Sequence, residues 1–201
     1  MKTPVALFAI AMSFETATAG STVKTIPKDY DPAQKEECIV IGRVDYVTNP
    51  HKPEKPHGNV SNKMANPMLT VKNEATRKSY YIDLEGPRWE FYVALPPGKY
   101  KVTEWTSGNL TAAPQVVFEL APCKPEPDSK PEQAPCPARY IGTLKYARET
   151  SKGAFWKGAM TQTIPGSWEV VDEYDDALKT FHESYPQLSC TAEKSLFQLK
   201  E

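Results

Sequence analysis

The sequence predicts a mainly β domain, an antiparallel β-sandwich with one C-terminal α-helix packed on it. Several short segments alternate apolar and polar residues with a period of two, which is typical of half-buried strands. Turn residues separate these segments at short intervals, as in sandwiches and barrels. One segment, after residue 172, has the apolar spacing of a helix.

The first nineteen residues are typical of a signal peptide. Lys2 precedes an apolar run from Val5 to Phe14, and Ala17-Thr18-Ala19 supplies an Ala-x-Ala cleavage motif. The run spans about ten residues, half of what a membrane span needs. We therefore expect a periplasmic or secreted protein that begins at Gly20, without membrane insertion.

The charge balance argues against strongly charged partners. The chain has 24 basic and 25 acidic residues, a formal net charge of -1. Neither nucleic acid nor an anionic membrane surface is expected as a partner. The roughly 180 residues after cleavage suffice for one domain with a core. We expect a flexible lead-in at 20–36 and a single domain at 37–201.

The first strands are predicted in order along the chain. Residues 38–47 are β-branched and nearly continuous, which indicates a central strand covered on both faces. Residues 49–67 are rich in proline and predict a long surface loop. Residues 68–73 and 77–84 predict a hairpin around a turn at 73–76.

The clearest predicted element is a hairpin over residues 89–105. The inward-facing side chains of its first strand are Trp89, Phe91, Val93 and Leu95. Pro97 and Gly98 suit a type II turn, because Gly accepts the positive φ that such a turn requires. On the return strand, Tyr100 and Val102 then point inward.

Two later segments repeat the alternation, at 116–120 and at 139–148. The second places Tyr140, Gly142, Leu144 and Tyr146 on one face. Between them, residues 121–137 include six prolines among seventeen residues. Such a segment predicts an insertion that protrudes from a sheet edge.

The C-terminal part predicts one more strand pair and the helix. Residues 153–171 suggest two strands across Pro165-Gly166, with Trp156 and Trp168 as anchors. A helix is expected over about 175–185, with Asp175 as N-cap and Pro186 after its end. Its apolar face consists of Ala177, Leu178, Phe181 and Tyr185.

Four cysteines predict two disulfides in an exported chain: Cys38, Cys123, Cys136 and Cys190. Three pairings are possible. Cys123 and Cys136 bracket the proline-rich segment, whereas Cys38 and Cys190 lie near the two ends of the domain, so we favour these two pairs. The alternative, a zinc site, lacks C-x-x-C or paired-His spacing.

One segment resembles a known family. Leu95-Pro96-Pro97-Gly98-Lys99-Tyr100-Lys101-Val102 is similar to the late hairpin of prealbumin-like and carboxypeptidase-regulatory-like β-sandwich modules, which are common in bacterial envelope proteins. Tyr140 to Leu144, the acidic helix start and Tyr185-Pro186 are similar to the segments after that hairpin in small bacterial envelope proteins of unassigned function. The resemblance implies an Ig-like or prealbumin-like topology and carries over no catalytic site.

No catalytic or metal-binding constellation is evident, so we expect no enzyme and no cofactor. His51 and His57 fall in the predicted loop and His182 on the predicted helix, and a G-x-S-x-G nucleophile motif is absent. The acidic residues at 172–176 lack the pattern of a calcium loop. Their charge suits a helix N-terminus instead.

The candidate binding residues include two tryptophans, one of them at the end of the predicted hairpin. If Tyr100 and Val102 point inward, Trp105 points outward beside Lys101 and Thr103, as on a binding face. Trp156 is a second candidate. Together with the signal-peptide pattern, and with the envelope location that the resemblance implies, these residues predict an exported, non-catalytic binding or assembly module of the bacterial cell envelope, whose partner is another envelope protein or a glycan. The alternatives are a hydrolase of an envelope polymer and a small-ligand carrier with an aromatic-lined cavity.

Overall fold

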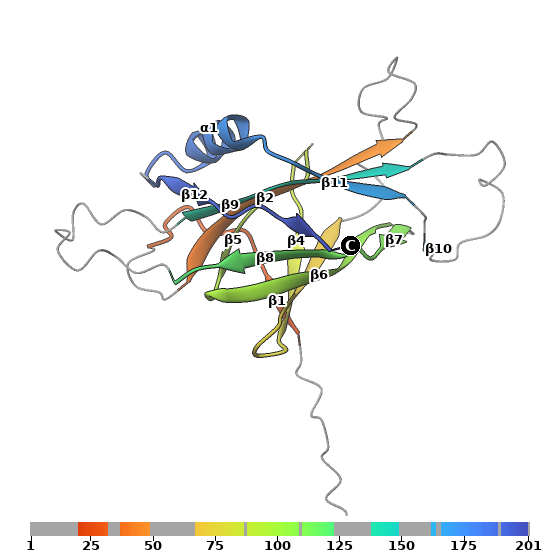
Figure 1. Ribbon diagram of the computed structural model, residues 1–201. Helices are drawn as coiled ribbons and strands as arrows, with labels where there is room; N and C mark the ends of the chain where they lie inside the picture. The colour runs from red at the N-terminus through yellow and green to blue at the C-terminus, as the bar shows by residue number, and fades with distance from the viewer. Residues whose placement is uncertain are drawn as a thin grey trace, which may run out of the picture.

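Over the residues that it describes, the structure is mainly β, with two mixed sheets and one helix (Figure 1). It is a computed structural model that describes residues 20–31, 37–48, 67–86, 88–108, 110–122, 138–148, 162–163, 166–188 and 190–200. The predicted signal peptide at 1–19, most of the predicted insertion at 121–137, and Trp156 lie outside the described residues.

One sheet has eight strands in the part of the chain that the structure describes. Six of them follow the order β1-β4-β3-β6-β7-β10, and β8 pairs with both β6 and β13. Their bounds are β1 Ser21–Val23, β3 Met68–Asn73, β4 Ser79–Asp83, β6 Gly98–Ser107, β7 Leu110–Ala112, β8 Val116–Leu120, β10 Gln162–Thr163 and β13 Gln198–Leu199. β3 and β4 form the predicted antiparallel hairpin. Asn73 Oδ1 accepts hydrogen bonds from the amides of Ala75 and Thr76 in its turn, at 3.0 and 2.9 Å.

The other sheet has five strands among the described residues, four of them in the order β11-β9-β2-β5, with β12 also on β9. Their bounds are β2 Cys38–Thr48, β5 Glu90–Leu95, β9 Ala138–Arg148, β11 Ser167–Val171 and β12 Ala192–Lys194. As predicted, β2 is central and covered on both faces. Val40 and Val44 pack in the core that both sheets share, and Ile39 and Ile41 pack in a second core on the opposite face.

The predicted antiparallel pairing does not hold for every strand. β2 and β9 run parallel over residues 39–48 and 138–148, and β1–β4, β7–β10 and β9–β12 are also parallel. Alternation in sequence indicates which face a residue occupies but not the direction of the neighbouring strand, so the direction could not be read from it.

The core between the sheets contains the predicted inward-facing residues. Phe91 and Leu95 of β5, and Tyr100 and Val102 of β6, are fully buried there, and Trp89 packs against them half-buried. The faces predicted for residues 89–102 are therefore confirmed.

The predicted hairpin itself is wrong. β5 pairs with β2 in the five-stranded sheet, whereas β6 pairs with β3, β7 and β8 in the other sheet. Pro96-Pro97 therefore carries the chain across the core from one sheet to the other. The predicted type II turn is not found there, because Gly98 begins β6 with a φ of 147°, not the φ of about 80° of such a turn. A hairpin and a crossing between two sheets show the same alternation in sequence, because in both cases the two strands turn their apolar faces toward one core.

The prediction that Trp105 points outward is wrong, because β6 contains a bulge. Its register against β3 shifts between Thr70 and Val71. The extra residue is Thr103, and one extra residue reverses the alternation of every later residue in the strand. Trp105 is therefore 0% exposed and lies in the shared core.

A second bulge changes the predicted face of β9. The register against β2 shifts after Ile41 and Tyr140, and the next pair is Gly42 with Gly142. Tyr140 consequently lies on the opposite face of the sheet from Leu144 and Tyr146, not on the same face as predicted. Gly142 takes a positive φ of 96° at this point, which glycine adopts readily.

The helix α1, Tyr174–Ser184, covers the outer face of the five-stranded sheet (Figure 1). It confirms the helix predicted at about 175–185. Ala177, Phe181 and Tyr185 are buried against Ile39 and Ile41, in a second core that does not face the other sheet.

The predicted N-cap, Asp175, is wrong by two residues. The N-cap position is Glu173, which makes no side-chain capping bond. Asp172 Oδ1 instead accepts a hydrogen bond from the amide of Tyr174, at 3.2 Å. The side chain of Glu173 contacts Arg43 and Thr143 of the sheet.

The lead-in predicted to be flexible at 20–36 is ordered over residues 20–31. β1 pairs with β4, and the amide of Ile26 donates to the carbonyl of Tyr92 at 2.8 Å. Ile26 and Tyr30 are buried in the second core. Their apolar side chains provide the burial that holds this segment; residues 32–36 lie outside the described residues.

The strand pair predicted at 153–171 is also wrong for those of its residues that the structure describes. β11 pairs with β9, but β10 pairs with β7 in the other sheet. The C-terminal residues then link the sheets again, since β12 pairs with β9 and β13 with β8. No helix in the described part of the chain is long and apolar enough to cross a membrane.

Candidate functional site

Five aromatic side chains gather between the sheets at one end of the structure, and we call them the aromatic cluster: Tyr46, Trp89, Trp105, Tyr146 and Trp168. They come from the ends of β2, β9 and β6, the start of β11 and the turn before β5. In Figure 1 this is the right-hand end, where β2, β9 and β11 run side by side.

Three of the five rings stand in a row across the five-stranded sheet. Tyr46 is the register partner of Tyr146, and Tyr146 is that of Trp168. Their ring centroids are 5.9 and 4.5 Å apart. Aromatic pairs at such spacing stabilise one another beyond their simple burial.

Trp105 projects from the opposite sheet into the middle of this row. Its ring centroid lies 5.6 to 6.1 Å from those of the other four members. Trp105 and Tyr146 are fully buried, and Tyr46, Trp89 and Trp168 are half-buried. The cluster thus has a buried centre and a partly exposed rim of three rings.

Two features of the cluster oppose stability. Trp89 has a left-handed backbone, φ 47°, which costs a non-glycine residue about 1–2 kcal/mol. The indole N–H of Trp105 is buried and has no hydrogen-bond partner among the described residues. An unsatisfied buried donor costs about 1–3 kcal/mol. Local strain and unmet polar groups of this kind concentrate at functional sites.

The predicted binding residues are not brought together as a face. Trp105 is in the core, and Lys101 and Thr103 are half-buried on β6. Thr103 Oγ1 donates to the carbonyl of Thr70 at 3.3 Å, so its hydroxyl serves the strand pairing. Trp156 lies outside the described residues.

Sequence reasoning missed the roles of Tyr46 and Tyr146 in this cluster. Both occupy core positions by alternation, so nothing distinguished them from ordinary packing residues. The available signal was their position near the ends of two long apolar strands, but it becomes informative only once β2 and β9 are known to be neighbours.

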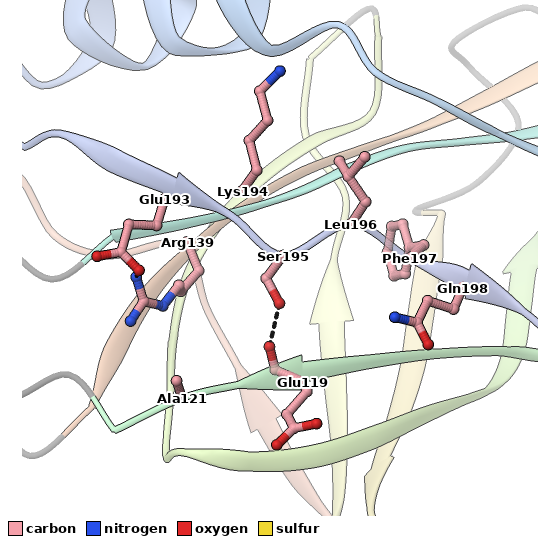
Figure 2. Close-up of a pocket in the computed structure, with 9 residues that line it drawn as sticks. All are labelled: Glu119, Ala121, Arg139, Glu193, Lys194, Ser195, Leu196, Phe197 and Gln198. Atoms are coloured by element: carbon pink, nitrogen blue, oxygen red, sulfur yellow. Dashed lines mark hydrogen bonds and ion pairs between the residues drawn. The ribbon is translucent and has the colours of Figure 1, made fainter.

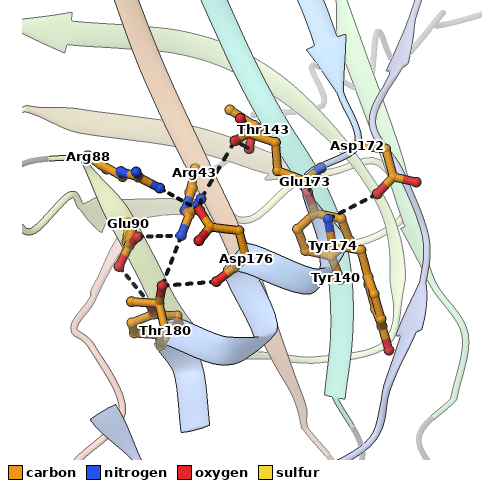
Figure 3. Close-up of polar contacts among 11 residues, drawn as sticks. Arg43, Arg88, Glu90, Tyr140, Thr143, Asp172, Glu173, Tyr174, Asp176 and Thr180 are labelled. Atoms are coloured by element: carbon orange, nitrogen blue, oxygen red, sulfur yellow. Dashed lines mark hydrogen bonds and ion pairs between the residues drawn. The ribbon is translucent and has the colours of Figure 1, made fainter. Parts of the chain in front are cut away.

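A second group of side chains surrounds Arg43 under the helix (Figure 3). Arg43 is 2% exposed. Its Nη1 lies 2.7 Å from Asp176 Oδ2 and 3.6 Å from Glu173 Oε2, and its Nη2 lies 2.8 Å from Glu90 Oε1. Nη2 also donates to Thr180 Oγ1 at 3.1 Å. These contacts tie β2 and β5 to α1.

The electrostatics of this group favour ion pairing over proton transfer. Burial alone would lower the pKa of Arg43, but the hydrogen bond with Asp176 and the nearby carboxylates outweigh it, and its pKa is raised. The hydrogen bond from Arg43 holds the pKa of Asp176 below its usual value. A carboxyl group held ionised in this way is a poor general acid near neutral pH.

Glu173 and Glu90 have further fixed partners. Glu173 Oε2 accepts a hydrogen bond from Thr143 Oγ1, and Glu90 Oε2 accepts one from Tyr92 OH, both at 2.8 Å. The acidic residues at the helix start therefore bind the sheet. They also suit the helix N-terminus, and only this second role was predicted from the sequence. The described residues hold no group of three or more His, Cys, Asp or Glu placed to bind a metal ion.

An open depression of about 490 Å³ lies where the C-terminal segment passes from β12 to β13 (Figure 2). Its lining is mostly polar: Glu119, Ala121, Arg139 and residues 193–198. Arg139 is paired with Glu193, and Ser195 Oγ donates to the carbonyl of Glu119. Because these polar groups already have partners in the fold, the depression is a weaker candidate for a binding site than the aromatic cluster.

Of the three histidines, His182 is described, and it lies half-buried on α1 with its ring against Phe181. His51 and His57 lie outside the described residues. The described contacts bring His182 to no carboxylate.

Cys38 and Cys190 are both disulfide-bonded. They lie on opposite faces of the five-stranded sheet: Cys38 is the register partner of Leu95, which faces the other sheet, whereas Cys190 packs in the second core beside α1. This placement argues against a Cys38–Cys190 bond, because side chains that point to opposite faces of a sheet point apart and cannot be bridged without backbone movement. Cys123 and Cys136 lie outside the described residues.

No family model, no curated protein and no solved structure matches the chain.

Proposed function

We propose that the chain is an exported, non-catalytic protein of the bacterial cell envelope that acts as a binding or assembly module, with the aromatic cluster as its recognition surface. Export to the periplasm or beyond rests on the signal-peptide pattern at 1–19. The envelope location, and an Ig-like or prealbumin-like β-sandwich topology, rest on the resemblance of residues 95–102.

The observation that carries the proposal is the composition of the cluster. Trp and Tyr dominate binding hot spots, because each combines a large apolar area with few rotatable bonds. Here Tyr46, Trp89 and Trp168 present half-buried rings around Trp105, and the surrounding fold accepts both a left-handed Trp89 and an unpaired indole donor.

The rest of the described chain supports a binding role over catalysis. The densest group of titratable side chains surrounds Arg43, where each carboxylate is committed to an arginine or a hydroxyl. A glycoside hydrolase of an envelope polymer would need one carboxyl group with a raised pKa beside an ionised one. Asp172 and Asp176, the described carboxyl groups with shifted pKa values, both have lowered ones.

The test uses residues 20–201 and two surface variants. Immobilised protein should retain an envelope component from a detergent extract or from purified cell-wall sacculi. Trp168→Ala should abolish retention, whereas Leu199→Ala should not, because Leu199 is a large apolar residue that is 48% exposed on β13, outside the cluster. Equal retention by both variants, or release of soluble fragments from the sacculi by the wild type, would contradict the proposal.

A further inference from the structure

The two described cysteines, Cys38 and Cys190, have bonding partners that the positions of their neighbours identify. Both are disulfide-bonded and both are buried. Because they lie on opposite faces of the five-stranded sheet, each bonds to one of the other two cysteines, Cys123 and Cys136, which lie outside the described residues. The described residues next to each cysteine decide which.

Cys38 faces the other sheet at the point where β8 ends. Its Sγ lies 3.5 Å from the carbonyl oxygen of Ala121, the residue that follows β8. Cys123 comes two residues after Ala121, and two residues span at most about 7 Å. The Cα atoms of a disulfide stand roughly 4.4–6.8 Å apart, so Cys123 is within bonding reach of Cys38.

Cys190 lies on the outer face of the five-stranded sheet, where β12 runs parallel to β9. Ala192 of β12 is the register partner of Ala138 of β9, and both pack in the second core with Cys190. Cys136 precedes Ala138 by two residues, just as Cys190 precedes Ala192. Side chains two residues apart on an extended strand share a face, and adjacent strands lie about 4.8 Å apart. This spacing suits a disulfide between Cys136 and Cys190.

The crossed pairing, Cys38 with Cys136, conflicts with the register of β2 and β9. Ile39 is the partner of Ala138 in that parallel pair, and both lie on the outer face. Two residues before Ala138, an extended chain returns to the outer face, whereas Cys38 is next to Ile39 and faces the other sheet. Side chains that point apart cannot be bridged without backbone movement.

We propose that Cys38 bonds to Cys123 and that Cys190 bonds to Cys136. The first bond joins the start of β2 to the chain after β8 and so links the two sheets. The second joins the segment after α1 to the chain before β9. Together they fix both ends of the proline-rich segment to the fold, one on each face of the five-stranded sheet. This connectivity does not depend on the proposed function.

Each bond forms by thiol–disulfide exchange with an oxidant that is itself a disulfide. One cysteine thiolate attacks the oxidant and releases one of its sulfurs as a thiol, and the second cysteine thiolate then displaces the other sulfur. The two cysteines lose two protons and two electrons, which the oxidant takes up as it becomes two thiols. Oxidised glutathione performs this step in vitro.

The experiment refolds the reduced full chain with oxidised and reduced glutathione, alkylates the remaining thiols and digests the protein without reduction. A protease that cleaves after glutamate separates the four cysteines, because Glu132 lies between Cys123 and Cys136. The cysteine-containing peptides are then 38–54, 120–132, 133–149 and 184–193.

Mass spectrometry should find peptide 38–54 joined to 120–132, and 133–149 joined to 184–193. Any other pair of joined peptides as the main product, or four alkylated cysteines, overturns the inference.

Two double variants give an independent count of free thiols, measured in urea so that burial does not hide them. Cys38→Ala with Cys123→Ala removes one proposed bond and leaves the other intact, so no free thiol should remain after oxidation. Cys38→Ala with Cys136→Ala is the matched control. It removes one partner of each bond, and both remaining cysteines should react as free thiols. Two free thiols in the first variant would overturn the connectivity.

Discussion

Replacing Arg43 with methionine tests how the helix is held to the sheet. Methionine fills a similar length but carries no charge, so it leaves Glu90, Glu173 and Asp176 without their shared partner. Removing one member of a buried ion pair costs about 3–5 kcal/mol. Glu173 and Asp176 are 39% and 52% exposed and can be rehydrated, so the lower end, about 3 kcal/mol, applies.

For a domain of this length, about 3 kcal/mol corresponds to a fall in Tm of roughly 6–12 °C. Thermal unfolding followed by circular dichroism at pH 7 measures it. Arg88→Met is the matched control, because Arg88 contacts the same Asp176 but is 54% exposed. Exposed pairs contribute about 0–1 kcal/mol, so the Tm of this variant should change by less than about 4 °C.

The pH dependence of the Arg43→Met effect has a definite sign. The pKa of Asp176 is lowered in the folded state, so its contribution is present above about pH 4 and is lost as the pH falls through the folded-state pKa. The difference in Tm between the wild type and Arg43→Met should therefore shrink below pH 4. Equal Tm losses in the two arginine variants, or a difference that persists unchanged at pH 3, would refute the reasoning.

The described contacts lead to three further expected outcomes. Gly42→Ala should destabilise the fold by about 1–3 kcal/mol in urea unfolding, since its Cβ would lie 2.3 Å from the buried Phe91 ring; a neutral effect would show that the core yields there. Burial raises the pKa of Tyr100 to about 12, so its contribution to folding stability is fully present below about pH 10 and is lost as the pH rises toward 12. Absorbance at 295 nm should show this tyrosine ionising together with unfolding. Titration of Tyr100 near pH 10 in the folded state would contradict the prediction. Non-reducing peptide mapping should find Cys38 and Cys190 in separate bridges, and one peptide joining the two would show that the assigned faces are wrong.

The faces of the strands and the position of the helix could be predicted because they depend on local periodicity. Phe91 and Tyr100 point where alternation places them, and Phe181 lies on the predicted face of the helix. These residues obey a period of two or of 3.6 whatever their neighbours are.

Neighbours and bulges could not be predicted, because both depend on contacts far away in sequence. The extra residue Thr103 in β6 has no local signature, yet it moves Trp105 from a predicted surface to the core. The crossing at Pro96-Pro97 resembles a hairpin turn until the partner of β5 is known.

The Arg43 group could have been anticipated in part. A lone arginine within the β-branched run at 38–47 predicts buried carboxylate partners, because a buried charge is stable only when it is paired. The acidic residues at the helix start were the nearest suitable group. The aromatic cluster was harder to predict from the sequence, since its five members lie on five separate segments.

The parallel pairing of β2 with β9 has a consequence for how the chain reaches this structure. Ile39 pairs with Ala138, 99 positions later, so the central strand of its sheet gains this neighbour only after most of the chain is available. Pairings between such distant residues carry a large loop-closure entropy and slow folding to milliseconds or seconds. During synthesis β2 lacks this neighbour until residues 138–148 have been made, so the five-stranded sheet cannot be completed before then.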